Sequence, residues 1–435
     1  MSKTRIESIR AFEVLDSRGR PTVEASVALA GGVIASAQVP SGASTGLSEA
    51  HELRDGDLQR HGGLGVRRAC LNVDGEIATA LMGADSLDQA GIDGRMIALD
   101  GTANKSRLGA NAILAVSCAV ARASAIAKGE PLWRCLAGHR KAVMPLPMVN
   151  ILSGGLHAAR AMEFQDFLAV PWVAASFEQA MEWIAAIHRC AREVLEGRGA
   201  YLTGVADEGG WGPKLATNED ALAVLTEAIE RAGLAPGEQV SIAIDVAASH
   251  FCEGGEYVLA SEGRRMAAVE FVEQLAGWCG KYPVVSIEDG LDQNAWSEWA
   301  ELTSRLGGQA QIVGDDFLTT NPLRLERAVA AKAANAVLVK MNQIGTLTET
   351  FAVVDAARRA GWRAVVSARS GETEDAFLAD LAIACGMAQL KVGSVTRSER
   401  LAKYNRLLVL EKTAGLAHWS TVPELLPPHW TTRAS

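Results

Sequence analysis

The sequence predicts an α/β protein in two parts, an N-terminal α+β capping domain followed by a C-terminal β/α barrel. Strand-like alternation fills the first forty residues and then gives way to helical periodicity. From about residue 139 onward, helices and short apolar strands alternate, which is typical of βα units around a mainly parallel sheet. A chain of 435 residues is also too long for one simple core. We therefore predict two domains, residues 1–138 and residues 139–435.

The first part begins with three runs that alternate in the manner of strands. They are IESIRAFEVLD, TVEASVAL and VIASAQV, separated by the turn-forming segments DSRGRP and AGG. This pattern predicts a three-stranded antiparallel meander, followed by helices from about Gly65 to Ala137. The most apolar long stretch, ANAILAVSCAVARASAIA, is interrupted by Asn111 and Arg122. We expect it to form a buried helix and not a membrane span.

The second part repeats a helix and a compact strand. One helix opens with a capping box from Ser176 to Gln179 and ends at Gly197, and another runs from a cap at Asn218 to Gly233. The strands read VSIAID, VVSIED, QIVGDD, AVLVK, AVVSAR and LKVG. An open doubly wound sheet normally carries a glycine-rich phosphate turn, and no GxGxxG or GxxxxGK[ST] motif occurs in the chain. A closed β/α barrel therefore fits the repeat better.

Charged residues recur at the expected strand ends, about one βα unit apart. In order they are Glu208, Asp245, Glu288, Asp315, Lys340, Arg369 and Lys391. Because the carboxyl ends of barrel strands form one face that carries catalytic groups, we expect all seven to converge on one pocket. The acids come first and the bases follow, so the pocket should have an anionic half and a cationic half.

The two halves point to a metal and an anionic substrate. Asp245, Glu288 and Asp315, with no histidine or cysteine at the same phase, suit a hard cation such as Mg²⁺. The basic residues suit carboxylate or phosphate groups. Such a site can polarise a carboxylate while a base removes the neighbouring proton. A lysine near cations and metal has a lowered pKa, so Lys340 could serve as that base.

Charge, the N-terminal residues and the cysteines argue against several other classes of protein. The net charge of −9 and the pI near 5.5 give no electrostatic footprint for nucleic acid. The N-terminal residues contain no apolar signal segment. Seven scattered cysteines without a CxxC pair indicate reduced thiols. We expect a cytoplasmic protein that binds neither nucleic acid nor membrane.

A series of motifs extends this interpretation along the whole chain. DSRGRPTVE, PSGASTG, ADEGGWGP, VSIEDG, LVKMNQIGTLTET and RSGETED occur in the order found in enolases, and the sequence resembles that family. The resemblance implies a barrel with an atypical antiparallel start and two Mg²⁺ ions per site, the second arriving with substrate. It also implies a homodimer or a higher homo-oligomer.

The same resemblance implies a role for each matching residue. Asp245, Glu288 and Asp315 would hold the first metal, and Ser44 would reach the second. Lys340 would remove the proton α to the substrate carboxylate, and Glu208 would protonate the departing hydroxyl. The remaining matching residues would bind substrate: Arg369 and Ser370 the phosphoryl group, Lys391 the carboxylate side, and His157 and Gln165 the entrance.

Two departures from the family pattern fall on positions expected to touch substrate. Enolases read QEF where this chain has Asp166, and SHRSGETED where it has Ala368. The family places Glu and His there, beside the phosphate and the leaving hydroxyl. Both changes shorten a side chain, so we expect a pocket with added room. The chain also departs from the family pattern at four other positions, where a substitution near the site need not change the function: Ser153, Ala206, His250 and Val392.

Three functions are compatible with this pattern. The chain could be an inactive scaffold, although Lys340, Glu208 and the metal carboxylates remain. It could be a true enolase that converts 2-phosphoglycerate to phosphoenolpyruvate in glycolysis. It could instead be similar to carboxyphosphonoenolpyruvate synthase, an enolase-like paralogue that dehydrates a phosphonoformyl ester of glycerate in phosphinothricin-type antibiotic biosynthesis. We favour the third, because that phosphono-glycerate substrate carries an extra carboxyl carbon that the added room would accommodate.

Overall fold

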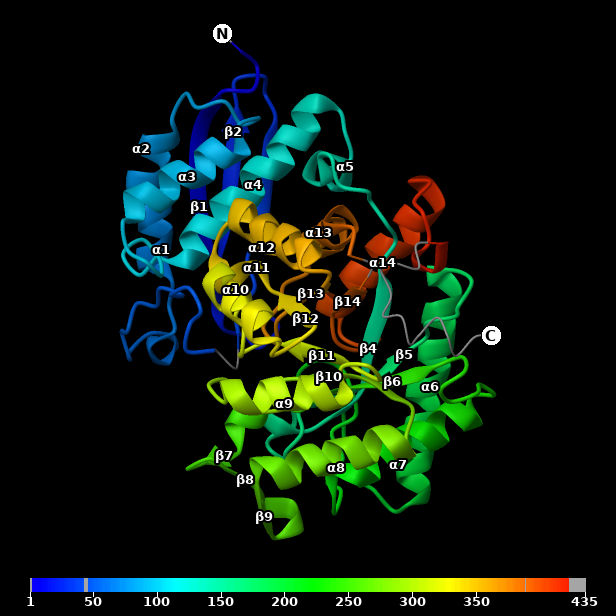
Figure 1. Cartoon of the computed structure of the whole chain (residues 1–435). Helices are drawn as coiled ribbons and strands as arrows, with labels where there is room; N and C mark the ends of the chain where they lie inside the picture. Colours follow the sequence, from blue (N-terminus) through cyan, green and yellow to red (C-terminus); the bar gives the residue numbers. More distant parts are fainter. Residues whose placement is uncertain (1, 43–45, 388, 422–435) are drawn as a thin grey trace.

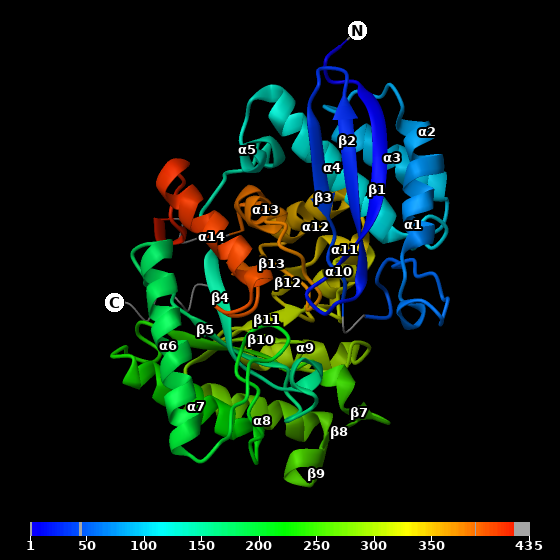
Figure 2. The same ribbon diagram turned by 180° about the vertical axis from the view of Figure 1, so that it is seen from behind.

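The computed structural model describes residues 2–42, 46–387 and 389–421. Two bodies lie side by side in it (Figures 1 and 2): a three-stranded sheet with its helices, drawn in blue to cyan, and a closed barrel surrounded by helices. The fold class predicted from the sequence is therefore confirmed.

The N-terminal sheet is the predicted meander. Its strands β1 (Ile6–Leu15), β2 (Pro21–Leu29) and β3 (Ile34–Gln38) pair antiparallel in the order β1-β2-β3. The tight connection between β1 and β2 sets Leu15 opposite Pro21. The helices that follow are α1 (Arg67–Asn72), α2 (Ala78–Leu81), α3 (Gln89–Asp100), α4 (Ala110–Lys128) and α5 (Leu132–Ala137), with a π-helical turn (Val73–Ile77) between α1 and α2.

Helix α4 forms the centre of this domain. It is the one helix in the described residues that is long and apolar enough to cross a membrane. Its side chains from Ala112 to Val120 are instead buried, and it packs against β2 and β3. Its end at Gly129, which takes a left-handed conformation with φ of 67°, is a typical helix stop. The prediction of a buried helix is confirmed.

The barrel contains eight strands in a closed ring. They are β4 (Leu146–Ser153), β5 (Asp166–Val170), β6 (Ser241–Asp245), β10 (Val284–Glu288), β11 (Gln311–Gly314), β12 (Ala336–Val339), β13 (Arg363–Ser367) and β14 (Gln389–Lys391). Strand β5 runs antiparallel to both β4 and β6, and the other neighbours are parallel. The barrel therefore has the antiparallel start that the resemblance implies.

Helices cover the outside of the barrel (Figure 1). They are α6 (Phe177–Gly197), α7 (Asn218–Arg231), α8 (Ala268–Lys281), α9 (Trp296–Leu306), α10 (Pro322–Ala331), α11 (Met341–Ile344), α12 (Leu347–Arg359), α13 (Phe377–Cys385) and α14 (Ser398–Thr413). A small sheet that the sequence did not suggest, β7 (Cys252–Glu253), β8 (Glu256–Leu259) and β9 (Arg264–Ala267), lies in the chain between β6 and α8.

One of the two predicted helix caps is in place. The Ser176 side chain accepts from the backbone N–H of Gln179, as predicted for α6, but the Gln179 side chain accepts from the N–H of Ala175, so the predicted capping box is only half formed. The predicted cap at Asn218 is wrong, because Thr217 is the extended residue that accepts from the N–H of Asp220, whose side chain bonds back in a capping box. The Asn218 side chain turns away and accepts from the N–H of Phe164 instead.

One acid of the RSGETED segment, Asp375, links the two domains, and another, Glu372, forms an ion pair within the barrel domain. Both oxygens of Asp375 accept from the guanidinium of Arg122 on α4, at 2.6 and 3.0 Å. Asp375 also accepts from the N–H of Phe377 at the start of α13. Glu372 lies 2.9 Å from the ammonium of Lys403 on α14. These carboxylates therefore have roles in the fold.

Candidate active site

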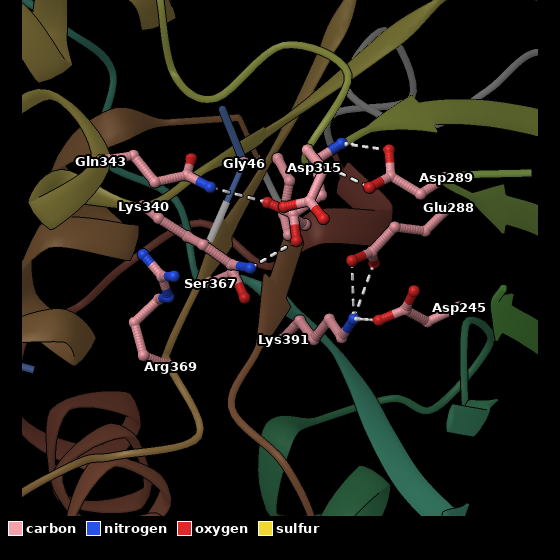
Figure 3. A network of polar contacts seen from close by, with 12 residues as sticks. Gly46, Asp245, Glu288, Asp289, Asp315, Lys340, Gln343, Ser367, Arg369 and Lys391 are labelled. Carbon is pink, nitrogen blue, oxygen red and sulfur yellow. Dashed lines mark hydrogen bonds and ion pairs between the residues drawn. The ribbon is translucent and has the colours of Figure 1, made fainter. Parts of the chain in front are cut away.

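A small cavity, largely filled by its own side chains, lies at the carboxyl end of the barrel. The residues that line it are His157, Gln165, Glu208, Asp245, Lys340, Ser367, Ala368, Arg369, Ser370 and Lys391. Every one except Ser367 belongs to the set chosen from the sequence. Figure 3 shows the central part of this site, with the lysines between the carboxylates. The structure thus brings together residues from most of the barrel strands and from the loops above them.

Lys391, at the end of β14, connects two of the predicted metal ligands. Its ammonium nitrogen lies 2.6 Å from Asp245 Oδ2 and 2.8 Å from both carboxylate oxygens of Glu288 (Figure 3). Burial lowers the pKa of Lys391, but the attraction of Asp245 and Glu288 outweighs it and holds that pKa well above the ordinary value. Lys391 is therefore a buried, paired cation.

Lys340, directly after β12, contacts the third predicted ligand. Its ammonium lies 2.5 Å from Asp315 Oδ2, and Gln343 Nε2 donates to Asp315 Oδ1 at 2.9 Å. Burial lowers the pKa of Lys340, but the neighbouring Asp315 outweighs that effect and raises it. The lowered pKa expected from the sequence is therefore not produced by the charges of the protein, because the closest charge to the lysine is an acid.

The three predicted metal ligands do not converge on one point. Among the described residues, two groups of three have possible ligand atoms within 4.8 Å of one another, and they are His157, Asp166 and Glu208, and Asp289, Asp315 and Asp316. The predicted set of Asp245, Glu288 and Asp315 is not one of them. Its carboxylates turn toward Lys391 and Lys340, which supply the positive charge at short range.

The carboxylates nevertheless fit a divalent cation. Burial raises the pKa of Glu288 well above its usual value, and the negative charges of Asp245 and Asp315 add to the effect. Burial and Asp315 likewise raise the pKa of Asp316 to about 7. Buried negative charge thus exceeds buried positive charge here, and the donors are all oxygens, as Mg²⁺ prefers. Asp245, Glu288 and Asp315 would be the residues that hold it.

Arg369 and Ser370, which follow β13, lie against the N-terminal domain. The Arg369 guanidinium donates to both carboxylate oxygens of Glu49, at 3.0 and 3.2 Å, and to Asn342 Oδ1 at 3.0 Å. Arg18 donates to Ser370 Oγ at 3.3 Å. The paired donors of Arg369 already bind a carboxylate, so their geometry suits a planar or tetrahedral anion.

His157 and Asp166 form a hydrogen-bonded pair beside the cavity. His157, in the short turn Gly155–Ala158, has Nδ1 2.9 Å from Asp166 Oδ2. Asp166 Oδ1 accepts from Asn150 Nδ2 at 2.6 Å and from Ser153 Oγ at 3.0 Å. Burial lowers the pKa of His157, but Asp166 and Glu208 outweigh it and raise that pKa to about 9. The imidazole is therefore a cation at neutral pH.

The position of Asp166 corrects one expectation. Asp166 is fully buried, at 0 % exposure, and does not line the cavity, whereas the sequence placed it in contact with substrate. Its short side chain is occupied by three donors, from His157, Asn150 and Ser153, all on the β4–β5 side of the barrel. Asp166 therefore acts on the cavity through His157.

Glu208 reaches the cavity from a loop. The sequence placed Glu208 at a strand end, but the structure has no strand between α6 and α7, so this prediction is wrong. Backbone hydrogen bonds fix the loop instead, since the Glu208 carbonyl accepts from the N–H of Ser394 at 2.8 Å. Burial raises the pKa of Glu208, but His157, Arg400 and the two site lysines outweigh it, so the pKa is lowered. Glu208 is an ionised carboxylate.

Of the last two residues predicted for the site, Ala368 lies in the cavity wall and Ser44 is not among the described residues. Ala368 is 6 % exposed and lines the cavity, while its N–H donates to the Lys391 carbonyl at 2.9 Å. Its place in the wall is therefore set by the backbone, and only a methyl group faces the cavity. Ser44 lies outside the described residues.

Several residues that were not predicted from the sequence hold the site together. Asp289 accepts from the N–H groups of Asp315 and Asp316, at 2.9 and 2.7 Å, and so fixes the end of β11. Its position next to Glu288 in VSIED was a usable signal. Glu49 carried no such signal, because its partner Arg369 is 320 residues away in the chain. Arg400 donates to the carbonyls of Arg369 and Ser370 from within a helix.

Comparison with known protein families agrees with the geometry. Residues 6–136 match the family described as the enolase N-terminal domain. Residues 141–420 match the family described as the enolase C-terminal TIM barrel domain. The two matches together span nearly the whole chain, and they follow one another as the two bodies of the structure do.

Proposed function

The chain belongs to the enolase family of Mg²⁺-dependent hydro-lyases, and we propose that it dehydrates a glycerate that carries a 2-phosphonoformyl group. Its reaction would then be like that of carboxyphosphonoenolpyruvate synthase in phosphinothricin-type phosphonate biosynthesis. The observation that carries this proposal is the cavity wall. At the two positions where the family pattern has His and Glu, this chain has the methyl group of Ala368 and an aspartate withdrawn from the cavity.

The cations of the cavity support an anionic substrate. Arg369 offers two parallel N–H donors that now bind Glu49, and a substrate anion could take the place of that carboxylate. Ser370 follows Arg369 in the chain, and its hydroxyl oxygen accepts a hydrogen bond from Arg18. Lys391, at the end of the neighbouring strand β14, also lines the cavity, and the family resemblance gives it the carboxylate side of the substrate. A substrate with a phosphorus-bearing group at one end and a carboxylate at the other matches this distribution of charge.

The chain's residues also support the proton chemistry. Mg²⁺ bound by Asp245, Glu288 and Asp315 would supply charge that stabilises the enolate-like form of the substrate carboxylate. Lys340 lines the cavity and would accept the α-proton as the neutral amine, a form that Mg²⁺ on Asp315 would favour by offsetting the charge that now raises the pKa of Lys340. Its contact with Asp315 keeps the side chain in one place. Loss of the β-hydroxyl then gives the enolpyruvate and water.

A true enolase remains the second candidate, and one observation favours it. The residues that the family resemblance assigns to 2-phosphoglycerate, including Lys340, Arg369, Ser370 and Lys391, all line the cavity. Nothing in their arrangement requires a substituent larger than phosphate. The two candidates therefore differ only in what occupies the space near Ala368.

Purified protein with Mg²⁺ and each of the two substrates tests the proposal. We expect the enolpyruvyl absorbance to appear with the 2-phosphonoformyl substrate and to be weak with 2-phosphoglycerate. Rapid turnover of 2-phosphoglycerate, with the larger substrate inert, would refute the proposed specificity in favour of the glycolytic enzyme. Absence of turnover with both would indicate a scaffold protein. The Lys340→Ala variant serves as the blank, because it lacks the proposed base.

A further inference from the structure

A groove lies between the two domains, outside the catalytic cavity. One wall comes from the start of α3 and from α4 and α5, and the other comes from α12 of the barrel (Figure 1). The groove has a volume of about 380 Å³, which is enough for a small organic molecule. It shares no lining residue with the catalytic cavity, and the proposed dehydration makes no use of it.

Much of the lining is apolar. Leu136 of α5 and Leu347 of α12 are buried, and Phe351 of α12 is half-buried. The Arg140 guanidinium covers the Phe351 ring, with its central carbon 4.3 Å from the ring centre. Arg140 also donates to both carboxylate oxygens of Asp355, at 2.6 and 2.9 Å. The charge of Arg140 is therefore balanced by Asp355, and its side chain supports the ring.

Several polar side chains of the groove are engaged within the protein. Gln89 Nε2 and Thr348 Oγ1 both donate to the carboxylate of Asp93, at 3.0 and 2.6 Å. Ser124 Oγ donates to the Ser86 carbonyl at 2.6 Å. Because the bonds to Asp93 join α3 to the start of α12, the groove lies where the capping domain is attached to the barrel.

Two polar groups of the lining have no such partner. The ammonium of Lys128, the last residue of α4, is exposed and makes no hydrogen bond or ion pair with any described residue. The Ser86 hydroxyl oxygen is buried and likewise has no partner among the described residues. Burial raises the pKa of the Cys135 thiol and the charge of Lys128 opposes that rise, so the ammonium is within electrostatic reach of the α5 side of the groove. Lys128 thus leaves the groove one unbalanced positive charge.

We propose that this groove binds a small organic anion with an apolar body. Its anionic group would pair with Lys128, and its body would pack against Phe351 and the aliphatic side chains around it. An inorganic anion would gain nothing from the apolar wall and would lose hydration there. A neutral apolar molecule would leave Lys128 without a counter-charge. The bound molecule would contact both domains and so favour their docked arrangement, whatever the substrate of the catalytic cavity is.

A pair of fluorescent dyes tests this proposal on the whole protein. The dye 8-anilinonaphthalene-1-sulfonate joins a sulfonate to an apolar aromatic body, and N-phenyl-1-naphthylamine has the same rings without the charge. Fluorescence titration measures the affinity of each dye. We expect saturable binding of one sulfonated dye per chain, which 2-phosphoglycerate with Mg²⁺ does not displace. The absence of saturable binding, or displacement by that glycerate, would overturn the proposed site.

Three substitutions distinguish the groove from other surfaces. Ala352→Trp, at an exposed position of α12 that lines the groove, should abolish saturable binding of both dyes. Ala330→Trp, at an exposed position of α10, is the matched control and should bind both dyes as wild type does. Lys128→Met should weaken binding of the sulfonated dye about two- to fivefold, the range for an exposed ion pair, and leave the uncharged dye unaffected. Thermal unfolding checks that each variant is folded.

Two half-buried cysteines report independently where the dye binds. Cys135 lines the groove, whereas Cys252 lies in strand β7 of the small sheet. Saturating sulfonated dye should slow the alkylation of Cys135 by iodoacetamide several-fold and leave Cys252 unchanged, as measured by mass spectrometry of peptides. An unprotected Cys135, or a folded Ala352→Trp variant that still binds the dye, would overturn the site. An unchanged affinity in Lys128→Met would overturn the anionic class of the ligand.

Discussion

Replacement of Lys391 by methionine tests whether the site lysines neutralise the metal carboxylates. Lys391 is 5 % exposed, and its ammonium makes short contacts with one oxygen of Asp245 and both oxygens of Glu288. Methionine retains much of the apolar chain but removes the charge. Removing one partner of a buried ion pair leaves an uncompensated buried charge and costs about 3–5 kcal/mol.

That cost can be expressed as a change in melting temperature. An unfolding entropy of about 2.1 cal/mol/K per residue gives roughly 0.9 kcal/mol/K for a chain of 435 residues that unfolds as one unit. A loss of about 3–5 kcal/mol then lowers the melting temperature by roughly 3–6 °C. Calorimetry in EDTA measures it directly. Lys412→Met is the matched control, because Lys412 pairs with Glu178 on an exposed surface, where the pair is screened by solvent, and should leave the melting temperature nearly unchanged.

The effect should depend on pH with a definite sign. Burial and Asp245 already raise the pKa of Glu288, and Lys391 opposes them. Without Lys391 that pKa rises further, so the folded variant binds a proton more readily than the unfolded chain does. Stability is then lost as pH rises. We expect Lys391→Met to be more destabilising at pH 8 than at pH 5, and Mg²⁺ to stabilise it more than wild type. A loss of stability equal at both pH values would refute this reasoning.

Three further variants follow from the same contacts. Lys340→Ala should lose α-proton exchange while calorimetry still shows Mg²⁺ binding; persistent exchange would remove Lys340 from the role of base. Arg400→Met, which removes donors to the carbonyls of Arg369 and Ser370, should raise KM about tenfold or more, and an unchanged KM would show that Arg369 and Ser370 bind substrate without that support. Asp375→Asn, which breaks the pair with Arg122 between domains, should cost about 1–3 kcal/mol in urea unfolding, and no loss would exclude a role in docking.

Much of the fold could be predicted because its signals are local. A short apolar run followed by a charged residue indicates a barrel strand. It also indicates that the charged side chain lies at the carboxyl end of that strand. Asp245, Glu288, Lys340, Arg369 and Lys391 were found in this way, and all lie at or next to the ends of barrel strands. The buried helix α4 and the N-terminal meander followed equally from periodicity.

The remainder depended on contacts between distant segments. Glu208 was placed at a strand end because its spacing fitted the repeat, but its loop is held by bonds to residues after β14 that no pattern near Glu208 announces. Asp166 was expected in the cavity because of its neighbours in sequence. In the structure, hydrogen bonds from Asn150 and Ser153 hold its carboxylate outside the cavity. The pKa of Lys340 depends on Asp315 lying within hydrogen-bond distance, which only the folded chain establishes.

We propose that the cavity beside Ala368 selects a substituent larger than phosphate. Direct competition tests it most simply: the protein, Mg²⁺ and equal concentrations of 2-phosphoglycerate and its 2-phosphonoformyl analogue are followed by phosphorus NMR, so that the ratio of initial rates equals the ratio of kcat/KM. We predict that the phosphonoformyl substrate is consumed first, and that Ala368→His shifts the ratio toward 2-phosphoglycerate. Preferential formation of phosphoenolpyruvate by the wild-type protein would refute this specificity.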